Sequence, residues 1–441
     1  MIKGKIRYLL KSQKVYSTGG SVLNAVFGLV SFSVLARGLS KEEFGLWTVF
    51  LTVLGLFEML RNGLVGSPLI KMSSGSDNQY FGDLVASALR LSLWFTLGSS
   101  VVVSIVYLIF YLVGDFVEYR DYVLWFVLCA FLAIPSSFGI WTSTAKIKFQ
   151  RVVLLNGSRR LLFMLSVLII FWLDLGLQEV FIAFTGVSLI VSIGSFIIGW
   201  TFLQKVSRFS AKYVKKMFDF GKYSMGTMLG GSALTSSDTF LIMFFMGPEA
   251  VAIYNVPMRI INLYDIPLRS LVQLAYPRLA KVKNQSGIGS FVKGLESSNG
   301  FAFLLLLPLS VCIFIFAEPI IFLIGGEDYI EASILLRVFC VYLVVTPLDR
   351  FAGIALDVLN RPNLNFRKMM LMVVINVIGD LVAIIYFDDI VYVAVASIIT
   401  FGIGVIAGYY FLRDVAPFRL GVLLVAGLGE ITKVVKRLLL K

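Results

Sequence analysis

The chain is dominated by long apolar segments, separated by short polar stretches. A bilayer's hydrocarbon core requires about 20 apolar residues per helix, and a helix satisfies its own backbone hydrogen bonds there. Hydrophobic residues make up 58% of the 441 residues and charged residues only 15%, with a mean hydropathy of +0.89. A soluble domain could not bury so much apolar surface. The sequence therefore predicts an all-α integral membrane protein.

The apolar segments predict about twelve transmembrane helices, six in each half of the chain. The first six predicted spans are 15–36, 44–70, 84–113, 122–141, 154–173 and 180–202. The second six are 220–246, 250–276, 298–317, 332–358, 366–387 and 390–412.

The basic residues are distributed unevenly between the two sides of these spans. One side, which includes both termini, carries 30 of the 39 lysines and arginines, and the other carries only Arg37, Lys41 and Arg120. Cytoplasmic loops carry such an excess, so both termini are expected in the cytoplasm and the protein in the cell (inner or plasma) membrane. The net charge of +13 is thus explained by orientation, and no nucleic-acid partner is expected.

The two halves of the chain resemble each other at an offset of 207 residues. Tyr16, Ser17 and Gly19 then align with Tyr223, Ser224 and Gly226; Glu42 aligns with Glu249, Trp47 with Tyr254, and Glu58 with Asp265. A repeat of this length predicts two pseudo-symmetric six-helix bundles. We expect bundles at 1–203 and 220–412, a cytoplasmic linker at 204–219 and a basic amphipathic tail at 413–441. The tail is expected on the inner leaflet, near anionic lipids, or as a simple topology anchor.

Several kinds of chemistry are excluded. The chain has no histidine, which rules out His-based metal sites and nucleophile pairs, and no phosphate-binding G-x-x-x-x-G-K-[ST] motif. Its three cysteines form no spacing motif. We expect a transporter with no cofactor or metal, rather than an enzyme. The alternative of another class, a membrane glycosyl or acyl transferase, would need an acidic or histidine cluster at one leaflet.

Ionisable side chains at membrane depth are costly and therefore mark candidate functional positions. The acidic ones are Glu58, Asp238, Asp265, Asp349, Asp357 and Asp380. The basic ones are Arg61, Arg90, Arg259, Arg269, Arg337 and Arg350, all arginines when Lys368 is counted with the preceding basic loop. Arginine suits phosphate because its planar fork binds two oxygens. We expect these arginines to line a cationic cavity.

Spacing assigns roles to some of these residues. Glu58 and Arg61 are three residues apart and Asp265 and Arg269 four apart, so each pair shares a helix face. Each can supply a counter-ion for a substrate-binding arginine or form a structural ion pair.

Other candidates have no acidic partner one turn away. Arg259 has none on its own helix and is the foremost candidate for a ligand-facing cation. Arg90 and Arg337 lie near span ends, where long side chains also reach the interface. Asp238 has no basic neighbour on its helix; we expect a proton or cation carrier, or the counter-ion of an arginine elsewhere. Asp349 is a further counter-ion candidate.

Two segments carry a family resemblance. LARGLSKEEFGLWTVF (Leu35 to Phe50) and MGPEAVAIYNVPMRI (Met246 to Ile260) resemble the starts of the two halves of polysaccharide-repeat-unit flippases. These belong to the multidrug/oligosaccharidyl-lipid/polysaccharide (MOP) exporter superfamily. The resemblance implies a two-lobed bundle that opens alternately to each side and turns a polyprenyl-pyrophosphate-linked oligosaccharide from the inner to the outer leaflet. It also implies O-antigen-type surface polysaccharide as the product, a polysaccharide polymerase complex as a candidate partner, and Arg37 as a gate or interface residue.

Alternatives remain within and outside this superfamily. A drug or cation exporter should offer an acid in the first span, yet residues 15–36 contain none. A lipid-II-type flippase is a nearer alternative. A non-transporting scramblase or assembly scaffold would tolerate loss of the central arginines.

Overall fold

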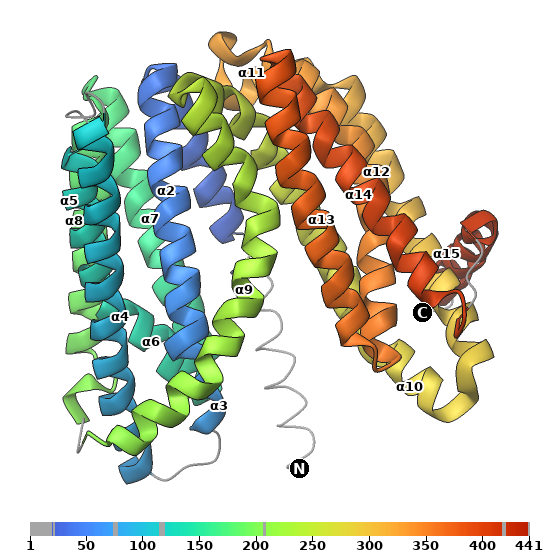
Figure 1. Cartoon of the computed structure of the whole chain (residues 1–441), viewed down its shortest axis with the longest axis horizontal. Coiled ribbons are helices and arrows are strands. Elements are labelled where there is room, and N and C mark those ends of the chain that lie inside the picture. The colour runs from blue at the N-terminus through green and yellow to red at the C-terminus, as the bar shows by residue number, and fades with distance from the viewer. Residues whose placement is uncertain are drawn as a thin grey trace. The chain divides into compact units, whose positions relative to one another are not determined.

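The computed structural model describes Gly20 and residues 23–73, 78–113, 120–205, 209–416 and 420–439. Throughout these residues the regular elements are helices, with no strand among them (Figure 1). The chain forms two compact units, Met1–Ser232 and Ala233–Lys441, and the boundary falls inside helix α9 (Ala211–Met246). The all-α prediction is confirmed. The predicted bundle limits stay a prediction.

Among the described residues of unit 1, the first long helix covers Leu23–Gly38. The unit continues with α2 (Lys41–Arg61), the π-helix η1 (Asn62–Gly66), α3 (Ser67–Met72), α4 (Asn78–Val113), α5 (Arg120–Leu132), α6 (Ile134–Ala145), α7 (Phe149–Trp172), α8 (Leu177–Ile197), the short η3 (Leu203–Lys205) and the first part of α9. Helices α4, α5 and α8 lie side by side (Figure 1).

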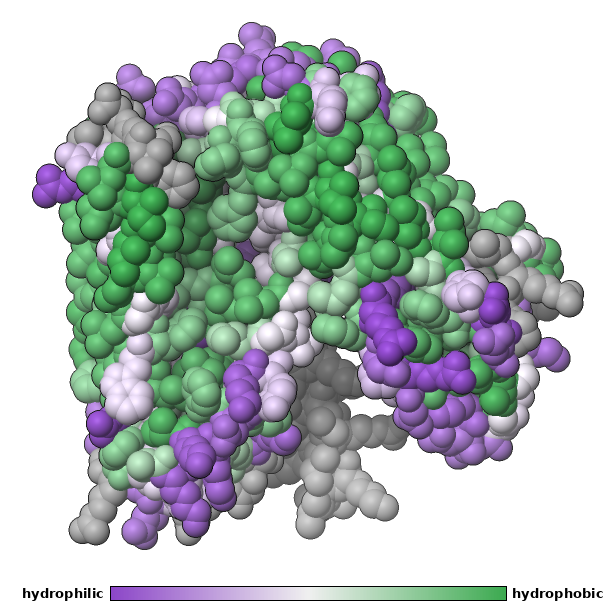
Figure 2. Space-filling model, viewed as in Figure 1, coloured by the Kyte–Doolittle hydropathy of each residue, from purple (hydrophilic) through white to green (hydrophobic). Residues whose placement is uncertain are grey.

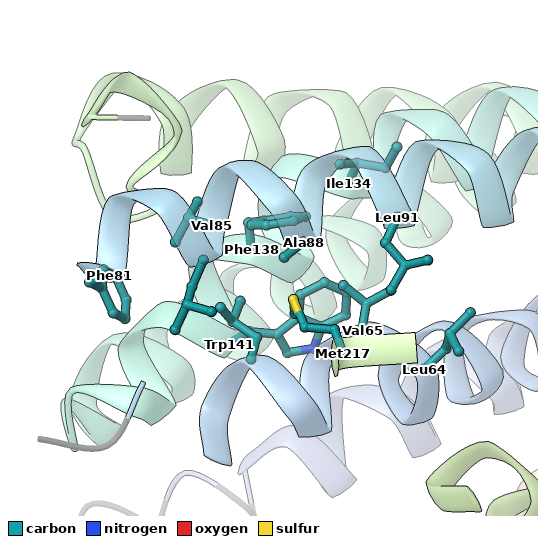
Figure 3. Close-up of a cluster of buried hydrophobic side chains, with 12 residues drawn as sticks. Leu64, Val65, Phe81, Val85, Ala88, Leu91, Ile134, Phe138, Trp141 and Met217 are labelled. Carbon is teal, nitrogen blue, oxygen red and sulfur yellow. The ribbon is translucent and has the colours of Figure 1, made fainter. Parts of the chain in front are cut away.

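Hydrophobic side chains from five elements, η1, α3, α4, α6 and α9, build a core cluster of unit 1. Figure 3 shows Leu91 and other residues of α4 meeting Val65 of η1, Phe138 and Trp141 of α6, and Met217 of α9. Phe138, Val65 and Met217 have no exposed surface. This cluster fixes the start of α9 against α4 and η1, beside the pocket described below.

Unit 2 contains the rest of α9, α10 (Pro248–Ile315), α11 (Ala317–Gly325), η4 (Glu327–Tyr329), α12 (Ala332–Val358), α13 (Pro362–Val382), the π-helix η5 (Ala383–Phe387), α14 (Ile390–Leu412), η6 (Leu420–Val422) and α15 (Leu423–Leu439). Helix α14 packs against both α12 and α13 (Figure 1). Asp389 caps α14 by accepting a hydrogen bond from the backbone N–H of Val391 at 2.8 Å.

Helix α10 is too long for one membrane crossing. Its 68 residues contain one non-helical position, Gly287, with a φ of 77° that glycine adopts without strain. Farther along, Gly300 lies against α15 so closely that an added Cβ would sit 2.1 Å from the backbone oxygen of Leu423. The absence of a side chain at Gly300 therefore allows α15 to dock on α10.

The sequence repeat has a counterpart in the helix starts. Helix α2 begins at Lys41 and α10 at Pro248, 207 residues later. Ser40 starts α2 through a capping box: its hydroxyl accepts a hydrogen bond from the backbone N–H of Glu43, whose carboxylate accepts one from the backbone N–H of Ser40. Gly247 occupies the equivalent position, and Pro248 takes the first helical position, where no N–H is needed.

The described residues contain nine helices long and apolar enough to cross a membrane, or ten if α9 is counted as one bent span. Figure 2 shows hydrophobic residues over most of the visible side of unit 1, with hydrophilic residues gathered towards its ends. The chain is a multi-pass membrane protein, as predicted, whereas the count of twelve spans stays a prediction. The first predicted span (15–36) lies partly outside the described residues, as do the basic side chains at the end of the tail.

Two predicted connections have helical structure. Residues 277–297, expected as a loop, continue α10 with Gly287 as the non-helical position. The second half of the expected linker 204–219 forms the first turns of α9, which begins at Ala211. Polar and basic residues at the ends of long helices give a loop-like hydropathy, which explains both differences.

Candidate functional site

A cluster of two arginines and one carboxylate joins α10 and α12 in unit 2. Arg269 Nε lies 2.5 Å from Asp265 Oδ2, and Arg350 lies 3.9 Å from the same oxygen. The side chains of Arg269 and Arg350 are 68% and 42% exposed, whereas that of Asp265 is 15% exposed. One carboxylate orients two accessible guanidinium groups, and the cluster keeps a net positive charge. Such a pair can bind a phosphate or pyrophosphate through several N–H donors.

A second cluster in unit 2 joins two buried carboxylates. The side-chain amide of Asn376 donates to Asp238 Oδ1 and to Asp380 Oδ2, both at 2.8 Å. The hydroxyl of Tyr254 donates to the other oxygen of Asp238 at 2.5 Å. Asp238 is 4% exposed and Asp380 is fully buried. Three helices, α9, α10 and α13, supply this acidic cluster.

The described contacts of the acidic cluster leave its two carboxylates without a basic partner. Asp380 Oδ1 is buried without a hydrogen-bond partner, and none of the described partners of Asp238 is basic. Buried carboxylates need compensation by a proton, a cation or a basic side chain. The arrangement therefore suits a proton or a small monovalent cation, and it disfavours the alternative that Asp238 is an arginine's counter-ion.

Helix α10 connects the two clusters. Tyr254 of the acidic cluster and Asp265 of the cationic cluster lie on α10, eleven residues and thus about 16 Å apart along the helix. Pro257 lies between them and removes one backbone hydrogen bond of the helix. Tyr254 also packs against Phe339 of α12, at 5.5 Å between ring centroids, and α12 carries Arg350. Helices α10 and α12 therefore both connect the acidic cluster to the cationic cluster.

In unit 1, the buried Arg61 forms an ion pair with Glu58, whose side chain is 28% exposed. Arg61 is fully buried, and its Nη2 lies 2.6 Å from Glu58 Oε1. Its guanidinium also donates to the backbone oxygen of Ala130 on α5, at 2.8 Å, and to the hydroxyl of Ser137 on α6, at 3.0 Å. These contacts connect α2 to α5 and α6. Of the two roles that the spacing allowed, the geometry favours the structural ion pair.

The remaining predicted residues lie apart from one another. Arg90 stacks on Trp94 and Phe209, with its guanidinium carbon 4.7 and 4.0 Å from the two ring centroids. Arg337 lies 3.9 Å from Glu318 in an exposed pair. The half-buried Arg259 lies on α10 between the two clusters. The exposed Arg37 lies at the end of the helix Leu23–Gly38.

The prediction that intramembrane basic residues are all arginines is wrong. Lys368 lies on α13 and is 4% exposed. Its Nζ is 2.5 Å from Asp349 Oδ1 on α12, so Asp349 pairs with a lysine rather than with a cavity arginine. In the sequence, Lys368 groups with Arg361 and Arg367 as a basic loop, whereas α13 begins at Pro362 and includes it.

Sequence reasoning also missed Asn376 and Tyr254, which hold the acidic cluster together. Both are neutral, so a search for charges passes over them. The available signal was an amide one helical turn before Asp380. Among the described residues, no three or more His, Cys, Asp or Glu side chains are grouped so that they could hold a metal ion.

Comparison with known proteins identifies a family. The profile of the family described as polysaccharide biosynthesis protein matches residues 10–283, more than half of the chain. The chain is 22% identical over 413 residues to the probable low-salt glycan biosynthesis flippase Agl15 of Haloferax volcanii, covering 90% of this chain and 82% of that protein. It is 22% identical over 330 residues to a putative O-antigen transporter of Shigella flexneri, covering 71% and 76% of the two chains.

Solved structures share the fold. The lipid II flippase MurJ in an inward closed conformation superposes with a TM-score of 0.77 at 15% identity, covering 95% of this chain and 91% of that chain. An inward-facing multidrug resistance MATE transporter of the MOP superfamily gives a TM-score of 0.69 at 16% identity, covering 89% and 95% of the two chains. The chain therefore has the MOP-superfamily fold. These proteins are named as flippases and transporters rather than enzymes, in agreement with the sequence prediction.

Proposed function

Because this chain belongs to the polysaccharide biosynthesis protein family, we propose that it is a flippase for lipid-linked glycan. The cargo we propose is a polyprenyl-pyrophosphate-linked oligosaccharide repeat unit, moved from the inner to the outer leaflet by alternating access. The protein acts in the cell (inner or plasma) membrane with both termini in the cytoplasm, and it delivers the unit to a polysaccharide polymerase complex. The names of the relatives from Haloferax volcanii and Shigella flexneri support this cargo class.

The observation that carries the proposal is the accessible cationic cluster of Arg269 and Arg350 around Asp265. A pyrophosphate presents several anionic oxygens, which two guanidinium groups can bind while Asp265 holds one of them in place. Arg259, on the same helix, is a further contact for the headgroup. Arg61, whose two Nη atoms already contact Glu58, Ala130 and Ser137, positions its helix and does not contact cargo.

The acidic cluster supplies the coupling step of this proposal. Protonation of Asp380 or Asp238, or binding of a small monovalent cation between them, reduces the buried negative charge by one and changes the contacts of Tyr254. The two states then differ at α10, which carries both Tyr254 and Asp265. A ligand that binds one state more tightly shifts the equilibrium between the inward- and outward-open forms.

The acidic cluster is also the one feature that favours a cation or drug exporter. Its burial argues against a drug-sized cation, because Asp238 and Asp380 are 4% and 0% exposed. The accessible charges near it are arginines, which repel cations. A lipid-II-type flippase shares the demand for pyrophosphate binding and is distinguished by its cargo.

The proposal is tested in cells that lack the gene and carry a labelled glycan. Cells expressing Arg269→Gln/Arg350→Gln should accumulate lipid-linked oligosaccharide on the cytoplasmic side, whereas wild type should not. Arg413→Gln is the matched control, since it removes an exposed charge of the same unit that lies 3.4 Å from Asp414 and stacks on Tyr410. Normal surface glycan in the double variant, at equal protein abundance, would contradict the proposal. Accumulation of the cell-wall precursor instead would assign the chain to the lipid-II branch.

A further inference from the structure

A pocket of about 540 Å³ lies within unit 1, near the start of α9. Its walls include Leu91 and Trp94 of α4, Phe209 before α9, and Val214, Lys215 and Phe218 of α9. Apart from Lys215 these side chains are apolar. Trp94 is 51% exposed and Phe218 48% exposed, so the pocket opens to the surroundings of unit 1. It is unsuited to a sugar, because it offers almost no polar groups for hydroxyls.

Two cations flank this apolar pocket. Arg90 is stacked on Trp94 and Phe209, which also line the pocket, and Lys215 forms part of its wall. Across the residues that the structure describes, no carboxylate pairs with either cation. The aromatic rings hold the guanidinium by its faces, which leaves its in-plane N–H groups available. The site thus combines an apolar cavity with two unpaired positive charges.

We propose that this pocket binds an anionic phospholipid, with an acyl chain in the cavity and the phosphodiester on Arg90 and Lys215. A Trp beside a basic residue is typical of the membrane interface, where its ring meets both the acyl chain and the headgroup. The surrounding segment from Lys205 to Lys222 is basic, and basic segments attract the anionic lipids of the cytoplasmic leaflet. This phospholipid is a resident ligand of unit 1, distinct from the cargo proposed for unit 2.

The charge of the headgroup sets the expected selectivity. Each basic residue near the membrane surface adds electrostatic attraction to an anionic headgroup. Two such residues should favour an anionic over a zwitterionic lipid by about 30-fold in affinity. Lys212, an exposed lysine of α9 that does not line the pocket, should contribute little to this preference.

Quenching of Trp94 fluorescence tests the proposal on the full chain in detergent. Phosphatidylglycerol with brominated acyl chains should quench wild type at about 30-fold lower concentration than brominated phosphatidylcholine. Trp94→Phe should remove the part of the quenching that differs between the two lipids, leaving the part that comes from exposed tryptophans such as Trp172. The preference should be lost in Arg90→Gln/Lys215→Gln and retained in Lys212→Gln. Arg90→Lys/Lys215→Arg should restore it, which separates charge from misfolding.

A pocket-filling variant provides a second, independent measurement. Ala211 lines the pocket and is exposed, so Ala211→Phe should fold normally while blocking the acyl chain and reducing quenching. Equal quenching by the two brominated lipids would overturn the proposal, as would unchanged quenching in Ala211→Phe. Displacement of phosphatidylglycerol by polyprenyl phosphate at lower concentration would also overturn it and assign the pocket to the carrier lipid. Inorganic phosphate alone should not displace it.

Discussion

The buried pair of Lys368 and Asp349 gives the sharpest prediction about stability. Their side chains are 5% and 8% exposed, and Lys368 Nζ donates to both Asp349 Oδ1, at 2.5 Å, and the Asp349 backbone oxygen, at 3.2 Å. Gly404 of α14 makes room for the pair, because a Cβ there would lie 2.9 Å from Asp349 Oδ1. Neither charge can reach water if its partner is removed.

Lys368→Met should therefore lower the free energy of unfolding by about 3–5 kcal/mol, since it leaves an uncompensated buried carboxylate. Asp349→Leu, nearly isosteric, should cost a similar amount by isolating the ammonium group. The double variant should recover to within about 1 kcal/mol of wild type or exceed it, because replacing both charges by apolar groups removes the desolvation cost.

The assay is equilibrium unfolding in mixed detergent micelles, with the four proteins of the double-mutant cycle compared at one temperature. The matched control is Arg337→Met, which breaks an exposed pair with Glu318 and should cost less than about 1 kcal/mol. Additive effects of the two single substitutions, with a double variant as unstable as their sum, would refute the buried ion pair.

Three further predictions follow from the buried contacts of the two units. Asp380→Asn should make flipping in vesicles indifferent to an imposed proton or sodium gradient, because one carboxylate of the acidic cluster is gone; a retained response would exclude it from coupling. Arg61→Met should lower the free energy of unfolding in micelles by about 3–5 kcal/mol, because it leaves Glu58 unpaired. The exposed Arg269→Met should lower it by less than about 1 kcal/mol, and equal losses in the two variants would contradict the structural role of Arg61. Gly300→Ala should displace α15 and speed its proteolysis, whereas Gly289→Ala, with open space around it, should not.

Local rules predicted the features that depend on one helix. Hydropathy located the long helices because each must be apolar over about 20 residues to cross the membrane. The ion pairs of Glu58 with Arg61 and of Asp265 with Arg269 are present, since residues three or four apart share a face. The starts of α2 and α10 are also separated by the repeat offset, because helix capping depends on a few neighbouring residues.

Features that depend on how helices meet were not readable from the sequence. Asp349 and Lys368 lie on different helices, so no spacing rule joins them. Arg90 stacks on Phe209, which is more than a hundred residues away in the sequence. Asn376 carries no charge, yet it connects Asp238 and Asp380. In each case the partner is chosen by tertiary packing, which a one-dimensional charge inventory does not contain.

The most direct test of the account is the movement of cargo by the purified protein. Labelled polyprenyl-pyrophosphate oligosaccharide is incorporated into vesicles with the protein, and a membrane-impermeant reagent measures the fraction of glycan on the outer face over time. If the chain is a glycan flippase, wild type should move glycan between leaflets, and Arg269→Gln/Arg350→Gln should move it no faster than vesicles without protein. Equal glycan accessibility in wild-type vesicles and protein-free vesicles, under either a proton or a sodium gradient, would contradict this function.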